Sequence, residues 1–351
     1  MNLYSDSRFP ARTTMKSIRF KHILSATLVL VACCLALFHF GCQGSPATTY
    51  NPNGNTFACK DTTFMLSTTN GGATWYWMTI RGASQVGHRV SDLGIGTNVD
   101  GGAFIRFIGG NATVCYPSPT TLGLTNLKYE SGETWISSNQ LYKSSDYGTH
   151  WTTVPGPYTS HDISTFEFGG AGTLLVAYED SIVRSTDYGH TWDTSALRVP
   201  FTLQGADYVH DIQFINIYGD VYAISLRGYV FCSTDGGAKW TAGVQIANAS
   251  LNATCSSGSS SGHTYQVIVG DGGLIMRSTN DGGTWMQENN QGADLISVTA
   301  DGAHWWAVGG QEIWKGDADA THWTKYTYPD PRIYFSSIWF FDQNSGSILG
   351  Y

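Results

Sequence analysis

Hydrophobic and polar residues alternate along most of this chain, in short runs separated by glycine and small polar residues. Residues 174–178 form one such run, residues 182–185 form the next, and Glu179, Asp180 and Ser181 lie between them. Period-two alternation bounded by turn residues predicts a β-strand, a tight turn and a second strand. Because the same succession recurs along the chain, we expect an all-β structure built from hairpins.

A frame of the form Ser-x-Asp-x-Gly-x-Thr-Trp follows most of these hairpins. The clearest copy runs from Ser185 to Trp192, and a worn sixth copy ends at Trp323. The acidic or amide residue and the tryptophan of the five clear frames are Asn70 and Trp75, Asp146 and Trp151, Asp187 and Trp192, Asp235 and Trp240, and Asn280 and Trp285.

The residue types of the frame suit a turn between two strands. An Asp or Asn side chain accepts hydrogen bonds from backbone N–H groups further along, and the glycine adopts a positive φ without a Cβ clash. Burial of the tryptophan ring contributes about 4–6 kcal/mol as an upper estimate. We therefore expect the frames to be structural elements, each a hairpin with its own packing anchor.

The spacing of the frames predicts a ring of small sheets. The tryptophans at 151, 192, 240, 285 and 323 lie 41, 48, 45 and 38 residues apart, which is the spacing of four-stranded β-propeller blades. We name the strands of a blade A to D from the axis outward, which places the frame at the C–D turn. The preceding A strands are expected at residues 162–168, 211–215 and 294–299.

The two ends of the repeat array decide the number of blades. Trp75 and Trp151 are two blade lengths apart, so we expect a blade without a frame there, with residues 104–107 and 112–116 as its B and C strands. Residues 334–342 and 347–351 read as A and B strands that complete the first frame's blade. The prediction is a seven-bladed β-propeller of four-stranded blades. A six-bladed ring is the alternative, if residues 57–59 are the first blade's own B strand.

These frames resemble Asp-box (BNR) repeats, the β-propeller modules of sialidases, sortilin-type receptors and photosystem II assembly-factor-like proteins. The resemblance covers residues 57–351. The pattern of the whole chain, including the closing residues 337–342 and Gly346, looks most like the photosystem II assembly-factor-like group. That resemblance implies a scaffold role, although the family's arginine-rich patch has no equivalent among the scattered arginines of this chain.

The net charge limits the class of ligand, and the cysteine content limits the possible disulfides. With 19 Lys and Arg against 27 Asp and Glu, the net charge is −8, which argues against a nucleic-acid ligand. Cys59, Cys115, Cys232 and Cys255 allow three disulfide pairings, of which Cys232 with Cys255 is nearest in sequence; free thiols are the alternative. No residue pattern indicates a metal site or a cofactor.

Residues 1–45 have the pattern of an export signal, because Arg12, Lys16, Arg19 and Lys21 precede an apolar run at residues 23–40. Cys42 is the favoured lipidation site, and Cys33 is the other candidate. A cleaved signal and a simple membrane anchor are the alternatives to a lipoprotein. Each places the propeller outside the cytoplasm, after a short linker at residues 46–56.

The strand order also assigns each loop to a face. The frames lie on one face with the A–B loops, and the B–C and D–A loops lie on the other. The polar residues expected on that second face are His161, Asp162, Glu179, Asp180, His210, Asp211, Arg227, Asp271 and Arg332. They predict either a polar pocket at the mouth of the central channel or, for the two His-Asp pairs, repeated strand caps.

Three functions follow from these residues. The favoured one is an exported, non-catalytic scaffold that binds a protein or a glycan on the face opposite the frames. The resemblance to sialidases implies, for a hydrolase, three converging arginines, a Tyr–Glu pair as nucleophile and an Asp as acid/base, and of the arginines only Arg227 and Arg332 fall on the right face. A two-carboxylate glycosidase would use two of Asp162, Asp211 and Asp271.

Overall fold

The computed structural model describes most of the chain from Thr63 onward. The described residues are 63–80, 85–90, 93–98, 101–108, 111–115, 126–146, 148–158, 162–178, 181–198, 207–216, 218–258, 264–340 and 342–351. All of them belong to the second of two compact units, Met1–Ala47 and Thr48–Tyr351. The predicted leader, the linker and Cys42 therefore lie outside the described residues.

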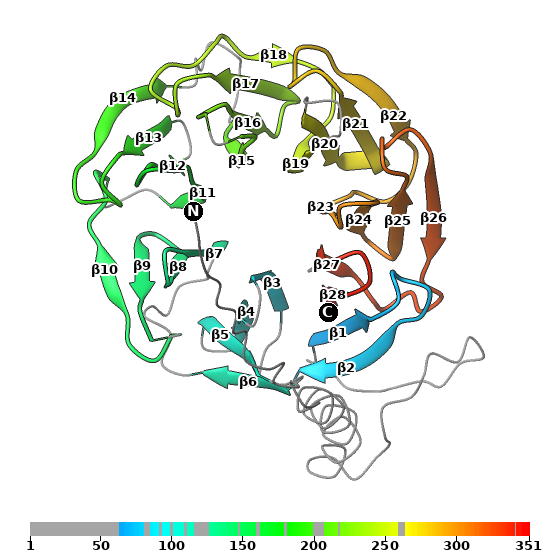
Figure 1. The fold of residues 1–351 in the computed structure, drawn as a ribbon. Coiled ribbons are helices and arrows are strands. Elements are labelled where there is room, and N and C mark those ends of the chain that lie inside the picture. Colours follow the sequence, from blue (N-terminus) through cyan, green and yellow to red (C-terminus); the bar gives the residue numbers. More distant parts are fainter. Residues whose placement is uncertain are drawn as a thin grey trace, which may run out of the picture. The chain divides into compact units, whose positions relative to one another are not determined.

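Strands β7 to β26 form five four-stranded antiparallel blades, in which chain order runs from the innermost strand to the outermost (Figure 1). The bounds of these strands are β7 (Asn126–Glu130), β8 (Glu133–Ser137), β9 (Leu141–Ser144), β10 (Thr152–Val154), β11 (Ile163–Phe168), β12 (Leu174–Tyr178), β13 (Ser181–Ser185), β14 (Asp193–Arg198), β15 (Val209–Phe214), β16 (Val221–Ser225), β17 (Tyr229–Ser233), β18 (Val244–Gln245), β19 (Leu251–Gly258), β20 (Thr264–Gly270), β21 (Leu274–Ser278), β22 (Met286–Asn290), β23 (Ser297–Ala300), β24 (Trp305–Gly309), β25 (Glu312–Gly316) and β26 (Trp323–Thr327).

Strands from both ends of the described chain build the sixth blade. Its order is β2 (Tyr76–Ile80), β1 (Thr63–Thr68), β28 (Gly346–Gly350) and β27 (Phe335–Phe340). In the antiparallel pairing of β1 with β28, Ser67 lies opposite Ser347, and their hydroxyl oxygens are 3.0 Å apart. This arrangement confirms that N-terminal C and D strands join C-terminal A and B strands.

The hydrophobic core lies between the blades. One cluster joins Leu175 and Ile182 of the β11–β14 blade to Ile212 and Phe231 of the β15–β18 blade, and the frame residue Trp240 packs against it. Four further clusters join other pairs of successive blades in the same way. Strands such as β12 and β16 are buried along their whole length because each blade is covered on both sides.

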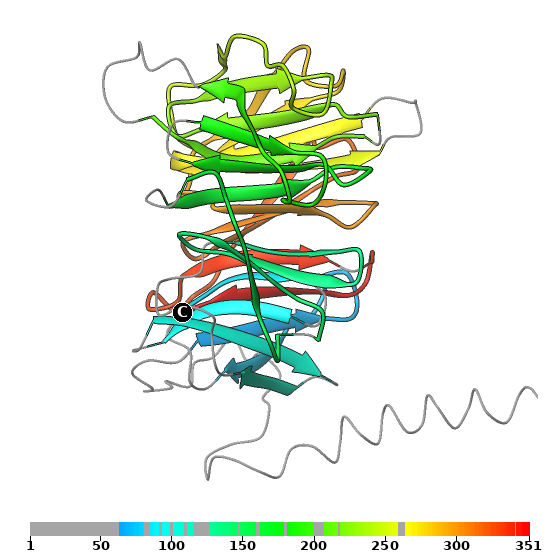
Figure 2. The same ribbon diagram turned by 90° about the vertical axis from the view of Figure 1, so that its left-hand side faces the viewer.

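Innermost strands contact one another in the order β27, β3, β7, β11, β15, β19, β23 and β27 again. Figure 2 shows this ring from the side, with the strands running across the view and the loops gathered at the two faces. The one helical element among the described residues is the short 3-10 turn η1 (Asp271–Gly273). Within those residues no helix is long and apolar enough to cross a membrane.

The predicted blade count and one strand assignment are corrected by the structure. The hydrophobic clusters join six four-stranded blades, which is the number of the alternative prediction, and not seven. The segment between Trp75 and Trp151 adds a sheet described by its backbone pairing alone: β3 (Gln85–Val90), β4 (Leu93–Asn98), β5 (Gly101–Ile108) and β6 (Asn111–Cys115).

Residues 104–107 therefore lie in the third strand of that sheet, β5, and not in the second. Residues 112–115 lie in the outermost strand, β6, and not in the third. The assignment was displaced by one strand because this segment carries no frame, so no recognisable turn fixed which strands were C and D.

Candidate functional site

The five clear frames share one hydrogen-bond network. In the frame at Asp187, the Ser185 hydroxyl donates to the Asp187 carboxylate over 2.8 Å and accepts the Gly189 N–H over 2.8 Å. The same carboxylate oxygen accepts the Thr191 N–H over 2.8 Å. Equivalent bonds are made by Thr68 and Asn70, Ser144 and Asp146, Ser233 and Asp235, and Ser278 and Asn280.

Two successive residues of the frame have a positive φ, where the sequence predicted one. Tyr188 has φ 55° and Gly189 has φ 82°; Gly236 and Gly237 have φ 71° and 84°. The N–H groups of Tyr188 and Gly236 donate to Gly172 and Gly219 in the A–B loops of their own blades. These turns are therefore held by their own blade as well as by the aspartate.

The degenerate sixth frame forms the same turn, although its aspartate stands one position earlier than in the other frames. Gly316 stands where the other frames have Ser or Thr, and Asp317 accepts the Thr321 N–H over 2.8 Å and the His322 N–H over 3.2 Å. Ala320 takes the place of the glycine with φ 57°. The turn geometry thus survives although the residue pattern is lost.

The frame tryptophans pack between blades. Trp75, Trp192, Trp240, Trp285 and Trp323 each lie against one of the interblade core clusters. Three of the five indole N–H groups donate to backbone carbonyls, namely those of Pro155, Gly237 and Ala320. Trp151 is partly buried. These contacts account for the frame residues as parts of the scaffold.

The opposite face carries the loops on which the sequence placed a site. His161, Glu179 and Asp180 lie outside the described residues. Asp162 is exposed just before β11. Asp211 in β15 accepts the N–H of Ile212 over 2.9 Å and the N–H of Thr254 in the next blade over 3.0 Å. Asp211 therefore acts as a cap between strands, as the structural alternative predicted.

His210 joins the same two blades. Its ring Nδ1 lies 2.7 Å from the carbonyl oxygen of Asn252, and the Asn252 amide donates to Leu295 O over 3.0 Å and to Asp271 over 2.9 Å. This chain of contacts crosses three successive blades. It positions the loop that carries Asp271.

The sequence did not predict a partly buried ionic cluster on three consecutive innermost strands. Lys128 in β7 donates to Glu167 in β11, and Asp211 in β15 interacts electrostatically with Lys128. Burial raises the pKa of Glu167 and of Asp211, and Lys128 opposes both rises. For Lys128 burial opposes the charged form, yet Glu167 and Asp211 raise its pKa overall.

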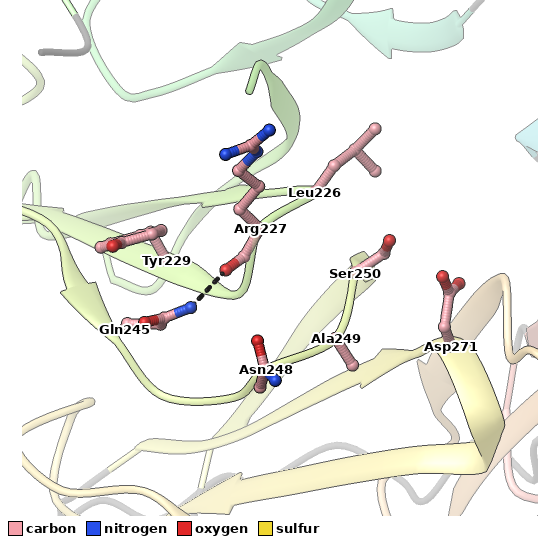
Figure 3. Close-up of a pocket in the computed structure, with 8 residues that line it drawn as sticks. All are labelled: Leu226, Arg227, Tyr229, Gln245, Asn248, Ala249, Ser250 and Asp271. Carbon is pink, nitrogen blue, oxygen red and sulfur yellow. Dashed lines mark hydrogen bonds between the residues drawn. The ribbon is translucent and has the colours of Figure 1, made fainter. Parts of the chain in front are cut away.

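Arg227 and Asp271 line one pocket of about 430 Å³ between the β15–β18 and β19–β22 blades. Both residues stand in B–C loops, as predicted, and Figure 3 shows them on opposite sides of the pocket. The full lining is Leu226, Arg227, Tyr229, Gln245, Asn248, Ala249, Ser250 and Asp271. Gln245 at the end of β18 and Asn248 and Ser250 in the following D–A connection also line the pocket, and the sequence did not predict a binding site from them.

Arg332 does not join this pocket. Its guanidinium makes two hydrogen bonds to Asp330, over 2.9 and 2.7 Å, in the connection between β26 and β27. Arg184 donates to Gly236 O and Arg277 donates to Glu288, both over 2.8 Å. The arginines with described side chains are therefore dispersed among the blades, and the three-arginine cluster of a sialidase is not formed by them.

Cys232 and Cys255 are both free thiols, so the pairing nearest in sequence is not made. Burial raises the pKa of Cys232 to about 11 and that of Cys255 to about 12. No group of three or more His, Cys, Asp or Glu side chains in the described ranges is arranged to hold a metal ion.

Solved structures of several β-propellers are similar to this chain. The WD40 β-propeller domain of Doa1 matches with a TM-score of 0.59 and 10% identity, over 81% of this chain and 96% of that domain. YCF48 from Cyanidioschyzon merolae matches with a TM-score of 0.54 and 16% identity, over 78% of this chain and 96% of its own.

A structure of YCF48 bound to D1 peptide matches with a TM-score of 0.54 and 15% identity, over 77% of this chain and 92% of that one. No family model and no curated protein matches the sequence. At these identities the structural matches show the fold, and the fold of this chain is that of a β-propeller.

Proposed function

We propose that this chain is a protein-binding scaffold whose contact surface is the face formed by the B–C loops and D–A connections. The observation that carries this proposal is the contrast between the two faces. On the frame face, the aspartate and serine side chains form hydrogen bonds within their own turns. On the loop face, Arg227, Asn248 and Asp271 are exposed around a pocket.

A solved structure with a similar fold supports a peptide or a protein as the ligand. YCF48, which has the same fold, has been solved bound to D1 peptide. The sequence resemblance to the photosystem II assembly-factor-like group points to the same kind of role. Scaffold propellers recognise partners through exposed loops on a rigid ring, because loops tolerate variation while the blades hold them in place.

We place this scaffold outside the cytoplasm, because residues 1–45 have the pattern of an export signal. Cys42 would tether the propeller to a membrane if it is lipidated, and residues 46–56 would serve as the linker. A cleaved signal would instead release the propeller. Mass spectrometry of the mature N-terminus distinguishes these two outcomes.

The hydrolase alternative has less support from the described residues. Asp211 is engaged by two backbone N–H groups, and Arg332 is engaged by Asp330. A carboxylate fixed in this way serves the strand arrangement, whereas a general acid or nucleophile needs to reach the substrate. Hydrolysis of fluorogenic glycosides by the purified chain, abolished by Asp162→Ala or Asp211→Ala, would contradict the scaffold proposal.

Site-specific photo-crosslinking in the source cells tests which face makes contact. A photoreactive residue at Asn248 reports on the loop face, and one at His190, which is also exposed, reports on the frame face. We expect a discrete protein adduct from position 248 alone, which the purified partner then reproduces. Adducts from position 190 alone, or equally from both, would contradict the proposal.

A further inference from the structure

Arg227 differs from the other arginines whose side chains are described. Arg184, Arg277 and Arg332 each donate to a carbonyl or a carboxylate. The contacts of Arg227 within the described chain are made by its backbone, and its exposed guanidinium carries no hydrogen bond there. Figure 3 shows this side chain projecting from the loop beside the pocket. A guanidinium has five N–H donors that suit a planar anion.

The loop that presents Arg227 is fixed by its own contacts. Asp207 is only 4% exposed, and its carboxylate accepts the Ser225 hydroxyl over 2.9 Å and the Arg227 N–H over 3.1 Å. Gln245 donates to the Arg227 carbonyl over 3.0 Å from the outermost strand of the same blade. Binding therefore needs little ordering of this backbone, which favours affinity.

The far side of the pocket is equally well held. The Asp271 N–H donates to Ser250 O over 3.1 Å, and the Asn252 amide donates to the Asp271 carboxylate over 2.9 Å. The Gly272 N–H donates to Asp294 over 2.8 Å. Asp271 is therefore a fixed negative charge that lines the same pocket as Arg227.

The other polar groups that line the pocket suit a peptide backbone. Asn248 offers an amide with both donor and acceptor atoms, and Ser250 offers a hydroxyl. Leu226 and Tyr229 supply apolar surface at the edge. An acidic side chain pairs with Arg227 in a fork geometry, whereas a dianionic phosphate would also meet the charge of Asp271.

Resting on the proposed scaffold function, we infer that this pocket binds a peptide segment carrying an aspartate or glutamate, whose carboxylate pairs with Arg227. Asp271 limits the site to one negative charge, so it disfavours phosphorylated and poly-acidic segments. Neutral polar side chains of the pocket hold the peptide backbone on either side of the acidic residue.

Selection from a displayed library of random decapeptides tests this inference with the full-length chain as bait. Peptides that bind are then measured against Arg227→Gln, which removes the charge, and Arg227→Lys, which keeps the charge without the fork. Arg332→Gln is the matched control on the same face, because its guanidinium is engaged by Asp330.

We expect the selected peptides to contain Asp or Glu and to bind Arg227→Gln at least about tenfold more weakly than the unchanged chain. Replacing the peptide's Glu with Gln has the same effect, and Arg332→Gln has little. Asp271→Asn improves binding of peptides with two acidic residues. Circular dichroism of each variant confirms that the fold is kept.

The inference is overturned if no peptide is enriched, if the selected peptides lack acidic residues, or if they bind Arg227→Gln unchanged. Binding of glucuronic acid in place of any peptide would also overturn it, in favour of an acidic glycan. If position 248 still crosslinks a protein partner in any of these cases, the scaffold proposal stands and only the acidic specificity fails.

Discussion

Asp187 shows how one side chain fixes a turn that holds two residues at positive φ. One carboxylate oxygen accepts the Thr191 N–H over 2.8 Å, and the other accepts the Thr191 hydroxyl over 2.6 Å. In the frame at Asn70, the amide instead donates to the Thr74 hydroxyl over 2.8 Å. The threonine hydroxyl reverses its role between donor and acceptor, which explains why aspartate and asparagine both occupy this position.

The frame residue Asp187 makes the free energy of unfolding depend on pH. Hydrogen bonds from Thr191 lower the pKa of Asp187 from 3.8 to about 2. A carboxyl with a lowered pKa stabilises the fold fully above its unfolded pKa of about 3.9 and loses that contribution as the pH falls toward the folded value. The substitution Asp187→Asn keeps the pattern of Asn70 and removes the titration.

We therefore expect the midpoint of thermal unfolding of the unchanged protein to fall relative to Asp187→Asn as the pH is lowered from about 5 to about 2. Thermal unfolding followed by circular dichroism across this range measures the difference. A difference that stays constant over the range would show that Asp187 does not contribute through its charge.

The frame hairpins at Gly72, Gly189, Gly237 and Gly282 also pack against the blade before them. A Cβ at Gly237 would lie 2.6 Å from a methyl carbon of Leu175 in the preceding blade, whereas a Cβ at Gly236 would lie 3.5 Å from the Arg184 guanidinium. Both glycines have a positive φ. Substitution of Gly237 therefore tests the contact between blades and the backbone strain together, whereas substitution of Gly236 tests the strain with little steric conflict.

We expect Gly237→Ala to lower the free energy of unfolding by about 1–3 kcal/mol more than Gly236→Ala. Urea denaturation measures both. In a Leu175→Ala background, itself destabilised by about 2–5 kcal/mol, the extra cost of Gly237→Ala should shrink because the clash is removed. Equal costs for the two glycine substitutions would contradict this packing of hairpin against blade.

The elements that the sequence predicted are those whose signal is local. Ser185, Asp187, Gly189 and Trp192 lie within one turn, so their spacing alone indicated the hairpin and its place in the blade. The unframed strands β3–β6 offered no such anchor, and their assignment was displaced by one strand. Tyr188 also has a positive φ, and because this position is not a glycine the sequence did not predict that conformation.

The candidate site was predicted only in part, because it depends on distant segments. Strand order placed Arg227 and Asp271 on one face, and they do line one pocket. The roles of Asp207 beneath the Arg227 loop and of Asn252 beside Asp271 arise from tertiary contacts. The ionic cluster of Lys128, Glu167 and Asp211 likewise joins strands of three blades, which no local pattern reveals.

At the scale of the whole molecule, the ring depends on a blade shared by two distant segments. Strand β1 lies between β2 and β28, so residues 280 positions apart in the chain become neighbours at Ser67 and Ser347. The loop face can present Arg227 and Asp271 from successive blades because closure holds those blades in register. A closed ring also leaves no long exposed sheet edge.

A disulfide between positions 67 and 347 tests ring closure directly. Ser67→Cys with Ser347→Cys should oxidise in the native protein, and oxidation should raise the free energy of unfolding by roughly 2–5 kcal/mol, reversibly on reduction. Ser67→Cys with Ser233→Cys is the control, because Ser233 lies in strand β17 of another blade and does not pair with β1. Failure of the first pair to crosslink under conditions where the protein is folded, or crosslinking of the control pair to the same extent, would contradict a ring closed by strands from both ends.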